Sequence, residues 1–164
     1  MSGSSAAAQQ DKPFGVIPIE QMRQMSGLEF LQSVFLNEGP RPPIGQIMNF
    51  GSSEIEFGKV MFEGNPSEKF YNPIGTVHGG YALTMLDSCM SCAVQSTLPK
   101  GTGYTTVELK VNFVKAMTAT TGTIRAEGKV INVGKRIGTA EGRVIDKDGK
   151  LIAFGTTTCL IFPI

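Results

Sequence analysis

The hydrophobic pattern changes its period along this chain. Between residues 79 and 96, apolar side chains recur at helical spacing and leave one narrow polar stripe, which predicts a long helix. Farther on, apolar and polar residues alternate with period two, which predicts strands. The predicted strands in this half cover residues 105–113, 121–133, 136–146 and 151–162. Asp148 and Gly149 supply the typical signature of a hairpin turn before the last of them.

Two short helices are predicted near the start of the chain. One covers residues 19–24, and the other begins at Ser26. Ser26 is followed three residues later by Glu29, which is the pattern of a capping box, in which each side chain bonds the other residue's backbone N–H. Gly39 and Pro40 then end the second helix.

Two strands are predicted between these helices and the long one, over residues 44–50 and 54–63, with a turn at 51–53. One helix combined with five or six antiparallel strands is an α+β layered design. The helix is apolar on most of its sides and needs cover on all of them. We therefore expect the sheet to curl around the helix.

Length and charge narrow the function classes. A chain of 164 residues suits a single domain, which we place at residues 13–164. Residues 1–12 are rich in Ser, Ala and Gln and are predicted to be a disordered leader, without the features of a secretory signal. The net charge of +1 provides no field for nucleic acid, and no apolar run approaches the ~20 residues of a membrane span. We expect a cytoplasmic protein that binds neither nucleic acid nor membrane.

The three cysteines are Cys89, Cys92 and Cys159. An odd number in a chain without a secretory signal argues against a disulfide framework. Cys89 and Cys92 form a C-x-x-C pattern, which can indicate a redox or metal site. No second pair is present to complete a zinc site, so we interpret both as small apolar side chains of the long helix and predict no metal or cofactor.

The segment from Asn72 to Gly80 is the chain's most informative motif, because His78, Gly79 and Gly80 lie where a loop becomes a helix. The first N–H groups of a helix have no intrahelical partner, and the helix dipole adds positive potential there. Glycine allows a ligand to approach the backbone closely. The segment is therefore either an ordinary loop-to-helix turn or an oxyanion hole for an ester or thioester carbonyl.

The polar stripe of the long helix contains a single acid, Asp87. The other members are small or uncharged: Thr84, Ser88, Ser91 and Gln95. A solvated helix edge normally carries several Lys, Glu and Arg residues. This stripe is therefore better suited to a narrow polar cleft or a subunit contact, although a solvated edge is the commoner use of such a stripe.

The spacing of Gly79 and Asp87 has a geometric consequence. Eight residues of helix separate them by ~12 Å, so one carbonyl group cannot contact both within the same chain. If both act on one carbonyl, the acid comes from a neighbouring subunit. The chemistry therefore predicts at least a homodimer with sites at its two-fold interface.

His78 is the chain's single histidine, and two roles are open for it. It could act as a general base or acid. However, no Gly-x-Ser-x-Gly nucleophile motif accompanies it. We favour the second role, in which its hydrogen bonds hold the loop.

With these residues the sequence resembles the hotdog-fold acyl-CoA thioesterases, in particular the branch of the phenylacetate-pathway and Arthrobacter-type 4-hydroxybenzoyl-CoA thioesterases. That branch has Asn or Gln, then His-Gly-Gly six residues later, then an acid nine residues after the His. Asn72, His78 and Asp87 keep these spacings (78 − 72 = 6; 87 − 78 = 9). The resemblance covers about residues 44–162.

The resemblance implies a role for each matching residue. The Gly79 N–H would polarise the thioester carbonyl, and Asp87 of the other subunit would attack it or activate a water. Asn72 would orient the thioester or the water. Hydroxyl groups beside the acid would come from Ser91 and from Thr106, with Thr105 as the neighbouring possibility.

Contacts with the rest of the substrate are also implied. Gly80 belongs to the binding segment, and Lys135 and Arg136 lie where family members meet the CoA nucleotide, although an ordinary solvated hairpin explains that pair equally well. Several apolar residues near the N-terminus could shape an acyl pocket, but we favour the core for each: Met22, Met25, Leu28, Phe30, Phe35 and Met48.

The sequence thus predicts a hotdog-fold acyl-CoA thioesterase that cleaves an aryl- or medium-chain acyl-CoA to the free acid and CoA. CoA is part of the substrate and not a cofactor. Family members are often dimers of dimers, so we expect a homodimer or homotetramer. The alternatives are a non-catalytic acyl-CoA-binding hotdog module and a hotdog dehydratase or hydratase.

Overall fold

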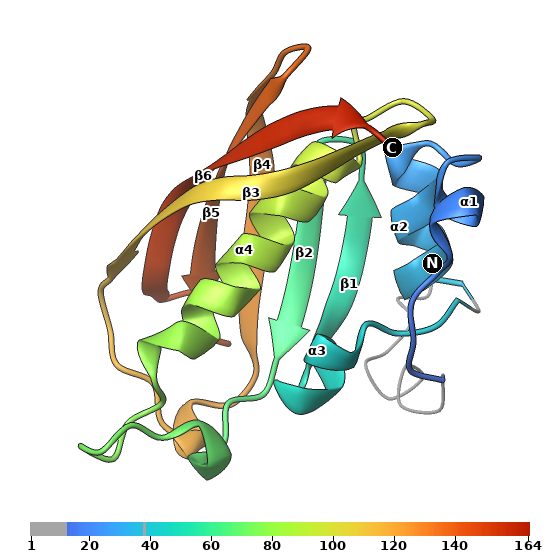
Figure 1. The fold of residues 1–164 in the computed structure, drawn as a ribbon. Helices are drawn as coiled ribbons and strands as arrows, with labels where there is room; N and C mark the ends of the chain where they lie inside the picture. The colour runs from blue at the N-terminus through green and yellow to red at the C-terminus, as the bar shows by residue number, and fades with distance from the viewer. Residues whose placement is uncertain (1–12, 38) are drawn as a thin grey trace.

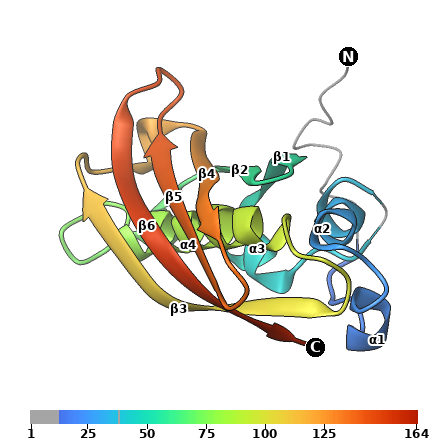
Figure 2. The ribbon, with the colours of Figure 1, turned by 90° about the horizontal axis from the view of Figure 1, so that it is seen from above.

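The computed structural model describes residues 13–37 and 39–164, so the predicted leader at residues 1–12 lies outside the described residues. Six strands form one sheet in the order β1-β2-β4-β5-β6-β3, and every neighbouring pair is antiparallel. The sheet curls around helix α4 (Gly79–Gln95) (Figures 1 and 2). This is the hotdog architecture, and it confirms the predicted α+β class.

The elements before α4 are α1 (Ile19–Met22), α2 (Gly27–Phe35), α3 (Pro43–Ile47), β1 (Phe50–Glu56), β2 (Lys59–Gly64) and the short 3-10 helix η2 (Glu68–Phe70). Those after it are β3 (Thr102–Phe113), the 3-10 helix η3 (Ala119–Thr121), β4 (Ile124–Val133), β5 (Ile137–Ile145) and β6 (Leu151–Pro163). None of the helices in the described ranges is both long and apolar enough to cross a membrane.

The predicted capping box starts α2. Ser26 N donates to Glu29 Oε2 at 2.7 Å, and Glu29 N donates to Ser26 Oγ at 3.3 Å. The helix then packs beside the end of α4, where Gly27 N donates to the carbonyl of Leu98 at 2.9 Å. A Cβ at Gly27 would overlap the carbonyl oxygen of Gln95, so only glycine fits at this crossing.

The strand predicted over residues 44–50 is wrong. Proline fits the first turn of a helix, and Pro43 begins α3, which ends before Asn49 takes a positive φ of 52°. The turn predicted at 51–53 is part of β1. The true turn lies at Gly58, whose φ of 75° suits glycine, so the run predicted over 54–63 is a hairpin.

The second of the later strands, predicted over residues 121–133, also starts at a different residue than the alternation predicts. Thr121 belongs to η3, and β4 begins at Ile124. In η3, Thr118 N donates to Thr121 Oγ1 at 2.9 Å, a side-chain cap that favours a helical turn over a strand.

Two glycines on neighbouring strands bring the sheet against α4, and a third continues their row across the sheet. Gly128 of β4 pairs with Gly142 of β5, which pairs with Gly155 of β6. A Cβ at Gly128 would overlap the backbone of Cys89 in α4, and one at Gly142 would lie 2.7 Å from Cγ of Met90. The helix therefore rests on strand backbone at this row, with Cys89 and Met90 fully buried.

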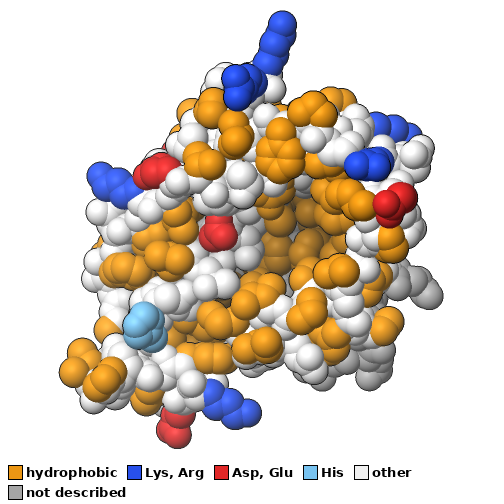
Figure 3. All heavy atoms as spheres, in the orientation of Figure 1, with side chains coloured by type: hydrophobic (Ala, Val, Ile, Leu, Met, Phe, Trp, Pro, Cys, Tyr) orange, Lys and Arg blue, Asp and Glu red, His pale blue; other side chains and the backbone are white. Residues whose placement is uncertain are grey.

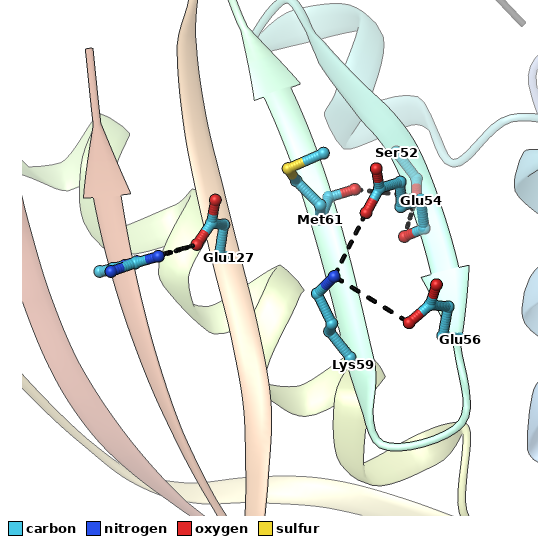
Figure 4. A network of polar contacts seen from close by, with 7 residues as sticks. Ser52, Glu54, Glu56, Lys59, Met61 and Glu127 are labelled. Carbon is cyan, nitrogen blue, oxygen red and sulfur yellow. Dashed lines mark hydrogen bonds and ion pairs between the residues drawn. The ribbon is translucent and has the colours of Figure 1, made fainter. Parts of the chain in front are cut away.

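The outer face of the sheet is charged. Lys59 lies 3.5 Å from Glu54 and 4.0 Å from Glu56, and Arg143 lies 2.8 Å from Glu127 (Figure 4). These exposed pairs contribute little to stability, at most about 1 kcal/mol each. Their position shows that the face away from α4 is in contact with solvent in the described chain.

Candidate active site

Asn72 organises the loop that leads into α4. Its Oδ1 accepts hydrogen bonds from the N–H groups of Ile74 (3.1 Å) and Thr76 (3.2 Å), and its Nδ2 donates to Thr76 Oγ1 at 2.8 Å. Gly75, with φ of 80°, makes the tight turn between them. Asn72 is therefore engaged with its own loop.

His78 is the N-cap of α4. Its backbone N–H donates to the carbonyl of Phe70 at 2.7 Å, and its Nδ1 accepts from the Gly80 N–H at 2.9 Å. A Cβ at Gly80 would lie 2.8 Å from that Nδ1, so glycine makes room for the histidine cap. The Nδ1 atom of His78 therefore already has a hydrogen-bond partner within the helix start. It also occupies the N–H of Gly80.

The Gly79 N–H opens α4, and within residues 13–37 and 39–164 it has no hydrogen-bond acceptor. It borders a groove of about 350 Å³ that is also lined by Asn72, Phe113 and Lys115. A Cβ at Gly79 would lie 3.0 Å from the Phe113 ring. An unpaired N–H at a helix start, facing open space, can bind an oxyanion.

Lys115 brings a positive charge to this groove. Its Nζ donates to Asp146 Oδ2 at 2.8 Å, and the Asp146 side chain is only 5% exposed. Together with the N–H groups of Lys150 and Asp148, the lysine lowers the pKa of Asp146 to about 2. The pair ties the chain after β3 to the turn that follows β5.

Asp87 lies two turns along α4, beside a different cavity of about 240 Å³. Its Oδ1 accepts a hydrogen bond from Thr106 Oγ1 at 2.9 Å. Ser88 and Ser91 line the same cavity, so the polar stripe borders a hollow that is open on this face (Figure 3), as expected for a cleft. Figure 3 shows this hollow lined mainly by hydrophobic side chains, with one acidic side chain at its edge.

A β-bulge in β3 decides which threonine meets Asp87. The strand pairs Thr106 with Cys159 and Glu108 with Thr158, so Val107 is an extra residue and is 56% exposed. Strict alternation, which puts Val107 and Leu109 on one face, is therefore broken. Thr106 shares the inner side with Tyr104, whereas Thr105 is exposed.

Tyr104 is a site residue that the sequence reasoning missed. Its hydroxyl donates to Ser91 Oγ at 3.0 Å, and its side chain lines the Asp87 cavity. The signal was available, since Tyr104 precedes Thr106 by two residues and thus shares its face of the strand. Phe35 and Arg41 of the N-terminal part also line this cavity.

The predicted basic pair lies away from both groups. Lys135 and Arg136 are exposed in the turn between β4 and β5, and this turn is followed by Gly138, which packs on Val94 near the end of α4. Within one chain, this turn is therefore at the opposite end of the helix from Gly79. Four of the six apolar N-terminal candidates pack against the core, namely Leu28, Phe30, Phe35 and Met48.

The cysteines are free and buried. Burial, with a smaller contribution from the charge of Asp87, raises the pKa of Cys92 to about 12, and burial also raises the pKa of Cys89. Both thiols therefore stay protonated at neutral pH, as packing residues do. In the described part of the chain, no group of three or more His, Cys, Asp or Glu residues is placed to hold a metal ion.

The fold is that of the hotdog proteins, and comparison with known proteins gives the class. The sequence model of the thioesterase superfamily matches residues 74–153, a range that contains His78, Gly79, Asp87 and Thr106. The chain is 32% identical over 120 residues to a candidate esterase of Saccharolobus solfataricus, SSO1253. This match covers 71% of the present chain and 78% of the relative.

Two further comparisons agree. The 1,4-dihydroxy-2-naphthoyl-CoA hydrolase of Listeria monocytogenes is 22% identical over 107 residues, covering 65% of this chain and 85% of the relative. The crystal structure of a candidate thioesterase related to phenylacetic acid degradation, from Ralstonia eutropha JMP134, has a TM-score of 0.71 and 26% identity, covering 79% of this chain and 98% of that chain. The chain belongs to the thioesterase superfamily and is a thioester hydrolase by class.

Proposed function

We propose that this protein hydrolyses aryl- or medium-chain acyl-CoA thioesters to the free acid and CoA. The observation that carries the proposal is the pairing of two half-sites on one helix. At its start, Gly79, whose N–H has no acceptor among the described residues, lines a groove, and two turns later Asp87 is held by Thr106 beside a separate cavity. The Gly79 N–H can bind the carbonyl oxygen of a thioester, and Asp87 can act on the carbonyl carbon.

The two half-sites meet across a dimer in this proposal. Strand β3 is an edge of the sheet, so it can pair with β3 of a second copy about a two-fold axis. With that axis between Leu109 and Lys110, Phe113 of one copy faces Thr106 of the other. Phe113 lies against Gly79 and Thr106 bonds Asp87, so this register brings Gly79 of one protomer toward Asp87 of its partner.

Hydrolysis then follows one of two routes. Asp87 attacks the acyl carbon, the C–S bond breaks, CoA leaves as the thiol after taking up a proton, and water hydrolyses the resulting anhydride. Alternatively, Asp87 takes a proton from a water that adds to the same carbon. In both routes the Gly79 N–H, assisted by the helix dipole, stabilises the negative oxygen. Asn72 and His78 act by holding the loop that aims this N–H.

The CoA nucleotide would extend toward the partner. Antiparallel pairing of β3 also reverses the direction of α4 and turns the partner's β4–β5 hairpin toward the Gly79 groove. Lys135 and Arg136 on that hairpin are exposed and can meet phosphate groups. Their replacement by Ala is expected to raise KM for CoA thioesters but not for pantetheine thioesters, which lack the nucleotide.

Thiol release from a panel of aryl, short-, medium- and long-chain acyl-CoAs tests the function. Wild type should release free CoA, and Asp87→Ala should lower kcat by at least about 10³-fold. A protein that binds acyl-CoA without releasing thiol from any of them would be a binding module. A change of absorbance at a double bond with the thioester intact would identify a dehydratase. Either result contradicts the proposal.

A further inference from the structure

A second cavity, of about 230 Å³, lies beneath the N-terminal segment, which we define as residues 13–37 and 39–48. It is distinct from the cavity of about 240 Å³ beside Asp87. Four residues belong to the linings of both cavities: Phe35, Pro42, Cys92 and Tyr104. These four residues therefore form a wall between the two spaces.

The N-terminal segment supplies two residues of this wall, and Phe35 is the larger of them. It is the last residue of α2, and its ring meets the ring of Phe62 edge to face, with centroids 5.2 Å apart. Phe62 is 1% exposed and meets Phe50 in the same manner at 5.7 Å. Edge-to-face contacts favour a defined orientation of the rings. The Phe35 ring is therefore held in the wall by buried aromatic neighbours.

The position of the wall sets the length of a chain that fits before it. Cys92, which is part of the wall, lies five residues after Asp87 and thus ~7.5 Å farther along α4. A fully extended chain advances about 1.2 Å per bond, since one residue of three bonds spans about 3.5 Å. About six bonds therefore separate a carbonyl carbon at Asp87 from the wall.

The cavity volumes agree with this length. The cavity beside Asp87, at about 240 Å³, has space for about eight water-sized groups at ~30 Å³ each. The second cavity would add about as many, and it reaches Gln95, which lies ~12 Å beyond Asp87 along α4. A chain that passed the wall could therefore extend over about ten bonds.

We propose that Phe35 is the residue that limits the length of the acyl group. This inference rests on the proposed function and specifies its substrate class as thioesters of acyl groups with about six to eight carbons. The apolar end of such a group contacts the rings of Phe35 and Phe62, while its carbonyl carbon lies beside Asp87. The Phe35 side chain closes the second cavity to the substrate, and its loss opens the wall on the side of α2.

Rates with butanoyl-, hexanoyl- and decanoyl-CoA test the inference. In wild type, we expect kcat/KM for hexanoyl-CoA to exceed that for decanoyl-CoA by at least about tenfold, because the ten-carbon chain is longer than the space before the wall. In Phe35→Ala, decanoyl-CoA should gain at least about tenfold relative to hexanoyl-CoA. A wild type that cleaves both substrates equally well, or a Phe35→Ala variant that keeps the wild-type ratio, overturns the inference.

Phe30→Ala is the matched control. Phe30 also belongs to α2 and lines the second cavity, but it does not line the cavity beside Asp87. Its replacement removes the same atoms from the same helix and leaves the wall in place, so the wild-type ratio should be kept. If Phe30→Ala changes the ratio as Phe35→Ala does, a loosened α2 explains the change, and the inference is wrong.

A milder variant covers the case in which Phe35→Ala does not fold. Phe35→Leu keeps an apolar side chain in the wall, and decanoyl-CoA should gain about threefold relative to hexanoyl-CoA. The absence of any gain in a folded Phe35→Leu variant contradicts the inference. If butanoyl-CoA is cleaved while these ratios fail, the proposed function stands without it. If no acyl-CoA releases thiol, both fall.

Discussion

On the side of α4 that faces the sheet, glycine backbone touches the helix and Cys89 and Met90 have no exposed surface, whereas the side that carries Asp87 borders two cavities. The first side, which we call the sealed side, holds the helix in position, because no side chain lies between Gly128 and the helix backbone. The second side, which we call the open side, is bordered by cavity volume and carries small hydroxyl groups. Rigid placement and a binding space are therefore combined in one helix by assigning them to opposite faces.

The largest expected effect comes from disabling the open side at its two half-sites. Asp87→Asn should lower kcat by about 10³-fold or more, and Gly79→Pro by about 10²–10³-fold, because proline lacks the N–H. Proline is well tolerated at the first helical position, and His78 already has the extended conformation that precedes proline (φ −58°, ψ 137°). Gly79→Ala, which keeps the N–H, is the matched control.

Mixing the two inactive variants sharpens this test. After exchange of subunits in equal amounts, about half of the dimers contain one copy of each variant, and one of their two sites has both Gly79 and Asp87 intact. We expect recovery of about a quarter of the wild-type rate. Two inactive variants that stay inactive after verified exchange would contradict a site shared between protomers.

The sealed side should respond in stability. Gly128→Ala places a Cβ against the backbone of Cys89, where no flexible side chain can move away. We expect a loss of about 3 kcal/mol in the free energy of unfolding, measured by urea denaturation. Gly134→Ala is the control, since a Cβ there would lie 3.6 Å from its nearest neighbour, an ordinary contact. Equal stabilities for the two variants would show that the helix does not rest on this row.

A smaller effect is expected from Thr106, which positions Asp87. Thr106→Val removes the hydrogen bond to Oδ1 and keeps the shape of the side chain. We predict a fall of about tenfold in kcat with little change in KM, since a hydrogen bond to a charged group contributes about 1.5–3 kcal/mol. Thr106→Ser should retain most of the rate. The matched Thr105→Val, on the exposed side of β3, should have wild-type kinetics.

The smallest effect concerns the ion pair beside the Gly79 groove. The pKa of Asp146 is lowered to about 2 from an ordinary value of ~3.9, so its contribution to stability is present above pH ~4 and is lost as pH falls toward 2. Asp146→Asn should lower the free energy of unfolding at pH 7 and make its fall between pH 4 and pH 2 less steep. Urea midpoints measured at pH 7 and across pH 4 to 2 test both effects. Asp148→Asn, at an exposed neighbour, should follow wild type.

The same two sides differ in how well the sequence predicts them. Regular periodicity located α4 and the later strands to within a few residues, because burial on the sealed side imposes a strict hydrophobic pattern. The strand predicted at 44–50 failed because a short apolar run after two prolines fits a helical turn as well as a strand. The bulge at Val107 shifts the alternation by one residue without leaving a sequence signal.

The open side was predicted in part. Asn72, His78, Gly79 and Asp87 were found from motif spacing, and the contact between Asp87 and Thr106 followed from the family resemblance. Tyr104 was missed although its two-residue spacing from Thr106 places it on the same face of β3, whereas the cavity beneath residues 13–48 was missed because it depends on how this segment packs across the helix. Packing between distant segments is not encoded in any local spacing. The roles of the predicted residues remain predictions until the variants above are measured.

The crossing at Gly27 has a consequence for how such a protein can change. The N-terminal segment meets the wrapped sheet and helix through backbone hydrogen bonds, among them Gly27 N to Leu98 O and Gly101 N to Arg23 O. None of its residues supplies a group to the proposed carbonyl chemistry. Mutations in this segment can therefore change the substrate preference while the reaction stays the same. New preferences could evolve, or be engineered, without changes to the hydrolytic residues.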